Sequence, residues 1–249
     1  MSPETKQDAY CYPNVPNDPD RTDVLRNRFD LRTHSELRPV EYRQTAFRIA
    51  EIREGDGPAG RFDPEHLKAI HHHIFQDVYE WAGHTRDERP IVDGRRVDPI
   101  GDMAKGETEF LHGSRVDRGL YEALKPIRDP NVLAGSTPEQ FAQRAGQVLG
   151  ELNFVHPFRE GNGRAQETFI AELGRAYGHD VEFAVITKAR MIEVSREAID
   201  DPSSTAMEHL TLDATDQNRR AAQRQGFADL ERYGETPMDH DLRTALPGQ

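Results

Sequence analysis

Residues 156–164 are HPFREGNGR, and they separate two segments in which apolar residues recur at helical spacing. The glycines on either side of Asn162 leave the backbone free to turn its N–H groups toward one point, directly before the second helix begins. Such N–H groups, together with the positive end of a helix dipole, form a binding site for anions. The stretch therefore predicts a helix–loop–helix with a phosphate site at the start of the second helix.

The charged side chains of this loop suit the same chemistry. Arg164, in the first helical turn, is a planar donor fork for a second phosphate. Glu160 is a hard oxygen ligand at the place where Mg²⁺ would neutralise two phosphates. His156 has an ordinary pKa near neutrality and is suited to accept a proton from a hydroxyl. Phe158, between polar neighbours, is expected to point into the core and anchor the loop.

Each of these features alone is usually structural: a single loop histidine is most often a packing residue, and Gly-Asn-Gly is most often a turn. The combined pattern is more specific, and it resembles the signature of the Fic family, HxFx(D/E)GNGRxxR, at every fixed position through Arg164. The stretch 62–86, FDPEHLKAIHHHIFQDVYEWAGHTR, and the segment YCYPN at 10–14 are also similar to Fic toxins and secreted Fic effectors. The resemblance covers about residues 10–200 and implies an all-α, Fic-type helical bundle with a small β-hairpin flap.

The resemblance also implies a reaction. His156 would deprotonate a Ser, Thr or Tyr hydroxyl of a target protein, which then attacks the α-phosphorus of ATP and receives AMP while pyrophosphate leaves. Glu160 would hold Mg²⁺ on the donor phosphates, Arg164 would contact the β-phosphate, and Asn162 and Arg164 would share the catalytic work with His156. The α-phosphate would lie on Gly161, Asn162 and Gly163. The flap would hold the target segment by strand pairing, through Pro90, Ile91, Val92, Asp93, Gly94 and Arg95.

The motif departs from the family at its last position, because Glu167 replaces the second arginine, which contacts the γ-phosphate in the family. Three interpretations follow. Glu167 pairs with Arg164 and the enzyme tolerates it, or the donor is a diphosphate-linked nucleotide without a γ-phosphate, or the chain is a catalytically silent Fic-fold binding module. The kinase-like branch of the family is disfavoured, because Gly161 and Gly163 are intact.

Many Fic enzymes are inhibited by a glutamate within an (S/T)xxxE(G/N) helix, and this chain contains no such motif. Ser204 to Glu208 has the spacing, but His209 follows. A small antitoxin chain is the family's other solution. With Glu167 in place of arginine, however, the inhibitory glutamate would lose its partner.

Periodicity and capping residues predict helices over 37–53, from Asp63 to about Gly83, and over 101–126, 137–155, 164–177, 188–199, 203–212 and 216–232. The pair Asp93-Gly94 favours a type I′ turn, and it predicts a single hairpin over 89–98. The expected organisation is an N-terminal arm (1–35), a Fic core (36–213) and a C-terminal helix with a loose tail (214–249).

The composition limits the alternatives. A net charge of −12 argues against binding to nucleic acid or to an anionic membrane. The single cysteine, Cys11, allows neither an internal disulfide nor a thiolate zinc site. The polar N-terminus and the lack of a long apolar run indicate a soluble chain made in the cytoplasm, with export by another kind of signal left open. His71, His72 and His73 are expected to be a partly buried cluster rather than a metal site.

Overall fold

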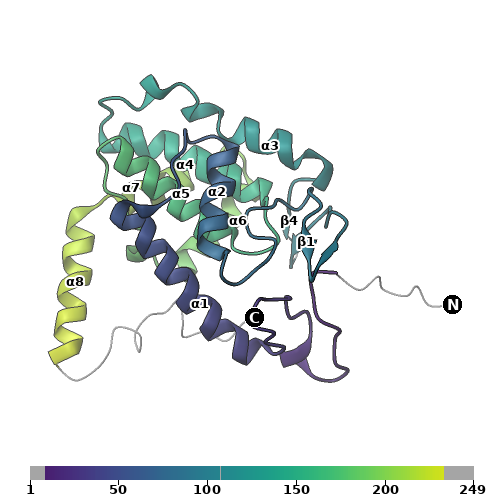
Figure 1. Cartoon of the computed structure of the whole chain (residues 1–249). Coiled ribbons are helices and arrows are strands. Elements are labelled where there is room, and N and C mark those ends of the chain that lie inside the picture. Colours follow the sequence, from purple (N-terminus) through teal and green to yellow (C-terminus); the bar gives the residue numbers. More distant parts are fainter. Residues whose placement is uncertain (1–8, 107, 233–249) are drawn as a thin grey trace.

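The computed structural model describes residues 9–106 and 108–232, and within them it confirms the all-α class (Figure 1). The C-terminal tail predicted to be loose, from residue 233 onward, lies outside the described residues. The helices are α1 (His34–Glu51), α2 (Pro64–Phe75), α3 (Val116–Ala123), α4 (Pro138–Val155), α5 (Asn162–Ala176), α6 (Lys188–Asp200), α7 (Ala206–Ala214) and α8 (Gln217–Arg232). Two short antiparallel hairpins join α2 to α3: β1 (Ile91–Val92) with β2 (Arg95–Arg96), and β3 (Ala104–Lys105) with β4 (Thr108–Glu109).

Helix starts follow the capping residues. Asp63 caps α2 through its carboxylate, which accepts from His66 N at 2.9 Å, and Pro64 occupies the first turn. At α4 the capping box is formed by Thr137 and Gln140. The reason is Pro138, which has no N–H to donate and so fits the first helical position, leaving Thr137 as the cap.

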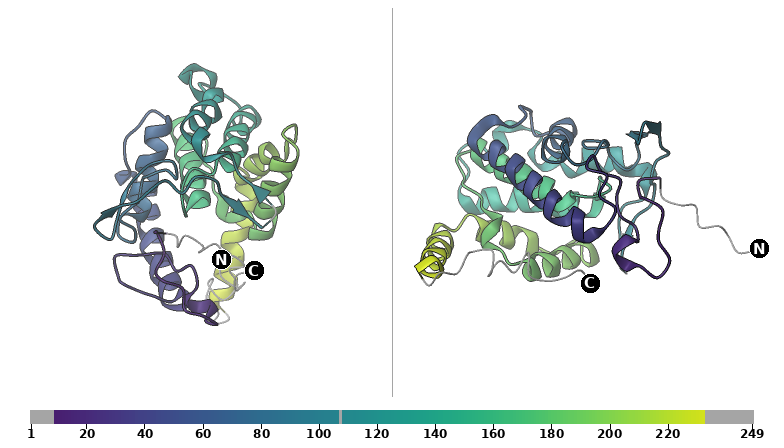
Figure 2. Two further views of the ribbon diagram at one scale, coloured as in Figure 1. Left: turned by 90° about the vertical axis from the view of Figure 1, so that its right-hand side faces the viewer. Right: turned by 60° about the horizontal axis from the view of Figure 1, so that its bottom comes forward.

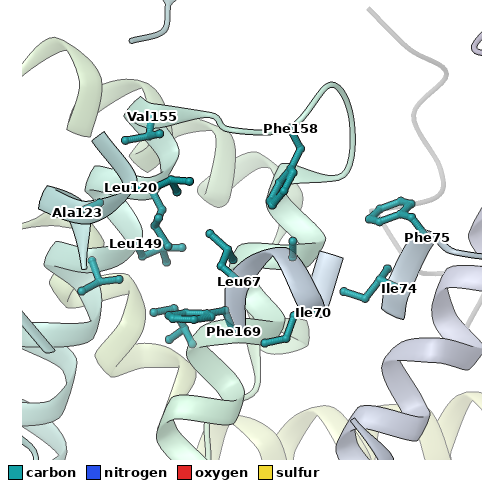
Figure 3. Packing of buried hydrophobic residues seen from close by; sticks show 14 of the residues in the cluster. Leu67, Ile70, Ile74, Phe75, Leu120, Ala123, Leu149, Val155, Phe158 and Phe169 are labelled. Carbon is teal, nitrogen blue, oxygen red and sulfur yellow. The ribbon is translucent and has the colours of Figure 1, made fainter. Parts of the chain in front are cut away.

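The middle of the bundle is α4, which packs against α3, α5, α6 and α7, while α2 packs against α1 and α5. Gly146 lets α4 and α7 approach closely, since a Cβ at this position would overlap the backbone of Glu208. Apolar side chains from α2, α3, α4 and α5 meet in a continuous core (Figure 3). The outlying helix is α8, at the edge of the molecule away from the hairpins (Figures 1 and 2).

The predicted helix over 101–126 is wrong in its first half. Ala104 pairs with Glu109 and Lys105 with Thr108, and helix α3 begins only at Val116. Glycines explain the difference: Gly101 and Gly106 take φ values of 80° and 63°, which break a helix. The sequence therefore contains a second hairpin that periodicity did not reveal.

The described part of the N-terminal arm, before α1, alternates extended stretches with turns and contains one 3₁₀ turn at Pro19–Arg21. It also belongs to the core. Tyr10, Cys11 and Tyr12 are buried, and the main chain of Cys11 pairs with that of Leu25 in an isolated antiparallel β-bridge. The ring of Tyr10 meets Trp81 edge-on at 5.9 Å. Across the described residues, the structure contains no helix with the length and apolarity needed to cross a bilayer.

Candidate functional site

The loop after α4 is held in one conformation by its own side chains. His156 ends α4 in the left-handed region, with φ 46° and ψ 61°, and its N–H donates to Leu152 O at 2.9 Å. Phe158 is fully buried and points from the loop toward α2, as predicted (Figure 3). The amide of Asn162 closes the loop, because its Oδ1 accepts from Phe158 N at 2.9 Å and its Nδ2 donates to Phe158 O at 2.8 Å.

This pair of hydrogen bonds limits how Asn162 can contact a phosphate. Its side chain is buried and committed to Phe158, so only its main-chain N–H is left for an anion. Gly161 precedes it with φ 81°, and the first hydrogen bond of α5 runs from Ala165 N to Gly161 O at 3.0 Å. The N–H groups of residues 162–164 therefore have no acceptor within the helix. They are the N–H groups that the sequence predicts as an anion cradle, and Gly163 among them is exposed.

His156 is neutral at physiological pH. Burial lowers the pKa of its imidazole to about 4, helped by the charges of Lys105 and Arg86 and opposed by the Asn153 carbonyl and by Glu160. The Nδ1 atom is buried and outside hydrogen-bond geometry with any described residue. A neutral imidazole can accept a proton, and its Nε2 atom is the one left to do so.

The guanidinium of Arg164 is held by α1. It donates to Glu41 at 2.5 Å and to Thr45 Oγ1 at 3.1 Å, approaches Glu160 at 3.5 Å, and lies over the Phe75 ring at 4.6 Å. The second oxygen of Glu41 accepts a hydrogen bond from the Tyr79 hydroxyl. Sequence analysis missed Glu41, because no local pattern connects residues 123 positions apart.

Glu167 lies one turn after Arg164 on α5 and is half-buried. The expected pairing of these two side chains is not among the ion pairs of Arg164, which are with Glu41 and Glu160. All three interpretations of Glu167 stay open.

Glu160 presents a carboxylate beside the cradle. Its side chain is 47 % exposed, and its Oε1 accepts from Gly161 N at 2.8 Å. The described residues contain no group of three His, Cys, Asp or Glu side chains that could enclose a metal. A single carboxylate beside an anion site fits Mg²⁺, which uses one or two carboxylates, substrate phosphates and water rather than a complete protein cage.

His71 supports the loop from α2, a role that sequence analysis missed. The expectation of a partly solvated cluster is wrong for this residue, whose exposed fraction is 0 %. Its Nδ1 accepts from Gly83 N at 2.9 Å, so its Nε2 carries the proton and donates to Glu160 O at 3.0 Å. Its ring stacks on Phe158 at 3.8 Å. The sequence feature that could have indicated its burial is its place on the apolar stripe of α2, between Leu67 and Phe75.

Replacing His71 with phenylalanine is expected to lower the free energy of unfolding by about 2–6 kcal/mol. The ring stacking survives, but the Gly83 N–H and the Glu160 carbonyl lose their buried partner, at about 1–3 kcal/mol each. Urea denaturation measures the loss. The matched control is His72→Phe on the exposed face of α2, expected to stay within about 0.5 kcal/mol of the parent. Equal stability of the two variants would contradict the role given to His71.

The predicted hairpin forms at its predicted turn. Asp93 and Gly94 have φ values of 52° and 69°, as a type I′ turn requires. Asp93 is tied to the N-terminal segment by an ion pair with Arg26 at 3.0 Å, and its N–H donates to Glu80 at 2.6 Å. The side chain of Ile91 is exposed on β1. These contacts place the turn against residues 26 and 80.

The second hairpin is the one that reaches His156. Phe110, directly after β4, stacks on the imidazole with ring centres 3.7 Å apart and planes 12° from parallel. The next residue, Leu111, donates its N–H to Phe154 O at 3.0 Å. The strand residues Ala104 and Lys105 are exposed. This hairpin therefore covers one face of the His156 ring, and the side chains of its first strand are exposed beside it.

Comparison with known proteins gives consistent matches. The family model described as "Fic/DOC family" matches residues 61–173. A protein adenylyltransferase of Bartonella henselae is 28 % identical over 96 % of this chain, which spans only 43 % of that relative. A probable protein adenylyltransferase, y4lH, of Sinorhizobium fredii is 35 % identical over 75 % of this chain and 85 % of its own. Among solved structures, BepC of Bartonella tribocorum, a VirB-translocated effector with bound AMPPNP, aligns with a TM-score of 0.74 at 32 % identity, covering 83 % of this chain and 96 % of that one.

Proposed function

The chain belongs to the Fic/DOC family, and we propose that it transfers AMP from ATP to a Ser, Thr or Tyr hydroxyl of a target protein. The observation that carries the proposal is the position of His156, a neutral base at the end of α4, in the same loop as the N–H groups that begin α5. Proton acceptor and anion cradle are then parts of one rigid turn.

The reaction balances with these groups. The target hydroxyl oxygen forms a bond to the α-phosphorus while its proton passes to Nε2 of His156. The bond from the α-phosphorus to its bridging oxygen breaks, and pyrophosphate leaves. The N–H groups of residues 162–164 stabilise the charge that grows on the α-phosphate oxygens. Mg²⁺, when held by Glu160 and the donor phosphates, would supply further charge neutralisation.

Arg164 is expected to bind the β-phosphate, which requires it to leave or share Glu41. A phosphate competes well for this guanidinium because its oxygens accept a planar donor fork. The Glu41 carboxylate then keeps the hydrogen bond from Tyr79. The side chain of Arg164 is 30 % exposed, which leaves a side open to an incoming nucleotide.

The target segment would dock by strand pairing. Residues 90–95 remain the predicted docking flap, and the second hairpin is added here as the better-placed edge. The support is Phe110, which lies against His156, whereas Asp93 at the tip of the first hairpin is fastened to Arg26 and Glu80.

AMP transfer is tested by which phosphate of ATP passes its label to a protein. The protein is incubated with Mg²⁺ and a bacterial or host lysate, together with ATP labelled either at the α- or at the γ-phosphate. A protein band that acquires the α-label but not the γ-label supports AMP transfer. A band labelled only from the γ-position would indicate phosphoryl transfer instead, and no label from either would reject ATP as the donor.

Glu167→Arg tests the nature of the donor. For a triphosphate, replacing a carboxylate with a guanidinium near the γ-phosphate is expected to lower the KM for ATP by about tenfold, about 1.4 kcal/mol. That is less than the roughly 4 kcal/mol of two charges at 4 Å near a surface. Glu167→Gln, which removes only the charge, should give a smaller decrease. An unchanged KM for ATP in both variants would favour a donor without a γ-phosphate.

A further inference from the structure

Arg86, which follows α2 by eleven positions, lies at the junction of the loop and the second hairpin. Within the described part of the chain, every acceptor of its guanidinium is a main-chain carbonyl. Nε donates to His156 O at 2.9 Å and Nη2 to Val155 O at 3.1 Å, and the same group also donates to Gly101 O and Leu111 O. The last two residues are the start and the end of the segment that contains β3 and β4. One side chain therefore joins both ends of the hairpin to the loop of the base.

The main chain of Arg86 reinforces the same junction. Its N–H donates to Pro157 O at 2.7 Å, and its carbonyl accepts from Ile100 N at 2.9 Å and Gly101 N at 3.3 Å. Three segments that are distant in sequence, at 100–101, 111 and 155–157, thus meet on this one residue.

The positive charge of Arg86 matches the negative end of the α4 helix dipole. Its exposed fraction is 0 %, and burial lowers its pKa, although an arginine remains charged at neutral pH. Burying a charge without a paired carboxylate is costly, so a residue that only filled space would be better apolar. The carbonyls of Val155 and His156 end α4, where the helix dipole is negative and a cation is favoured. Arg86 is therefore matched to the end of α4 at which the base stands.

We propose that Arg86 is a positioning residue that fixes the separation between the β3–β4 hairpin and the imidazole of His156, so that a target segment held along the hairpin presents its hydroxyl to the base. This inference rests on the proposed AMP transfer. It assigns Arg86 no contact with nucleotide, because its partners are the carbonyls of the loop and the hairpin.

Arg86→Lys is the informative variant, since lysine keeps the charge but cannot reach four carbonyls as a planar fork. The rate of labelling is measured against lysate concentration and against ATP concentration. We expect kcat to fall by about 10–100-fold and the half-saturating lysate concentration to rise at least threefold, because both base and hairpin move, while the KM for ATP stays within twofold. The control is Arg89→Lys, three residues further on, whose exposed side chain pairs with Asp98 at 3.4 Å. It should match the parent in all three quantities.

A second readout needs no activity. Because Phe110 stacks on His156 at 3.7 Å, the ring protons of His156 should be shifted upfield in an NMR spectrum of histidine-labelled protein. In Arg86→Lys these signals should move toward their unstacked positions, while circular dichroism confirms that the helices remain.

The kinetic and NMR measurements distinguish failure of the Arg86 proposal from failure of the AMP-transfer proposal. If Arg86→Lys loses only kcat, with both half-saturation values and the ring signals unchanged, its role is merely structural and the proposal is overturned. If the parent protein labels nothing but the ring signals still move in the variant, the AMP-transfer proposal fails, while the positioning of His156 by Arg86 stands.

Discussion

His156→Asn and His156→Ala are expected to lower the rate of AMP transfer by about 10²–10⁴-fold, the usual contribution of a positioned general base. Asparagine is the more informative replacement because it tolerates the left-handed conformation that His156 adopts, with φ 46°. The loop and the cradle should therefore persist in His156→Asn while the proton acceptor is removed. Initial rates of α-label transfer at saturating ATP measure the effect.

His209→Ala, which changes an exposed histidine on α7, should transfer at the parental rate. A His156→Asn variant that is folded and keeps more than a tenth of the parental rate would show that another group accepts the proton.

The pH dependence follows from the same residue. The pKa of His156 is lowered to about 4, so the base is neutral, and competent, above that value. Transfer should rise with pH through about 4 and show no inflection near 6.5, where an exposed histidine would titrate. The unfolded chain binds the extra proton between these two values, so the free energy of unfolding also rises with pH across this window. Rates measured from pH 5 to 8 that follow a single titration near 6.5 would contradict the buried state of the base.

Gly161→Ala is expected to disrupt the loop and the fold together. Gly161 has φ 81°, which costs an alanine roughly 1–2 kcal/mol. The added Cβ would also overlap the ring of Phe75, which is fully buried between His71 and Arg164, and overpacking of this kind costs about 1–3 kcal/mol. The free energy of unfolding should therefore fall by about 2–5 kcal/mol, measured by denaturant unfolding, and label transfer should be lost.

Gly163→Ala is the matched control, two positions further on. A Cβ at Gly163 meets nothing within 4 Å, and this residue is exposed. Its stability should equal or exceed that of the parent by up to about 1 kcal/mol, since alanine favours a helix. Transfer should still fall, because the new methyl group would lie where the phosphate approaches the N–H groups. Equal loss of stability in both variants would show that Phe75 does not constrain Gly161.

The local parts of the site were predictable because their causes are local. The order of residues in the loop, from His156 through Gly161 to Arg164, predicted a turn between two helices, and the structure has it. Capping by Asp63 and the turn at Asp93-Gly94 depend on side chains within four residues of each other, and both were predicted correctly. The second hairpin was missed because the glycines that bend it, Gly101 and Gly106, interrupt a segment that otherwise has helical periodicity.

By itself, then, the sequence determined the helix–loop–helix and the family, since these depend on contiguous residues with fixed backbone preferences, and it predicted an anion site at the start of the second helix. Tertiary structure alone decided the surroundings of that loop. It stacked Phe110 on His156, turned Arg164 to Glu41, placed His71 against the Glu160 carbonyl and gathered three distant segments on Arg86. The physical reason is that burial, pKa and buried hydrogen bonds depend on atoms brought together from distant parts of the chain, and local sequence patterns carry no information about such neighbours.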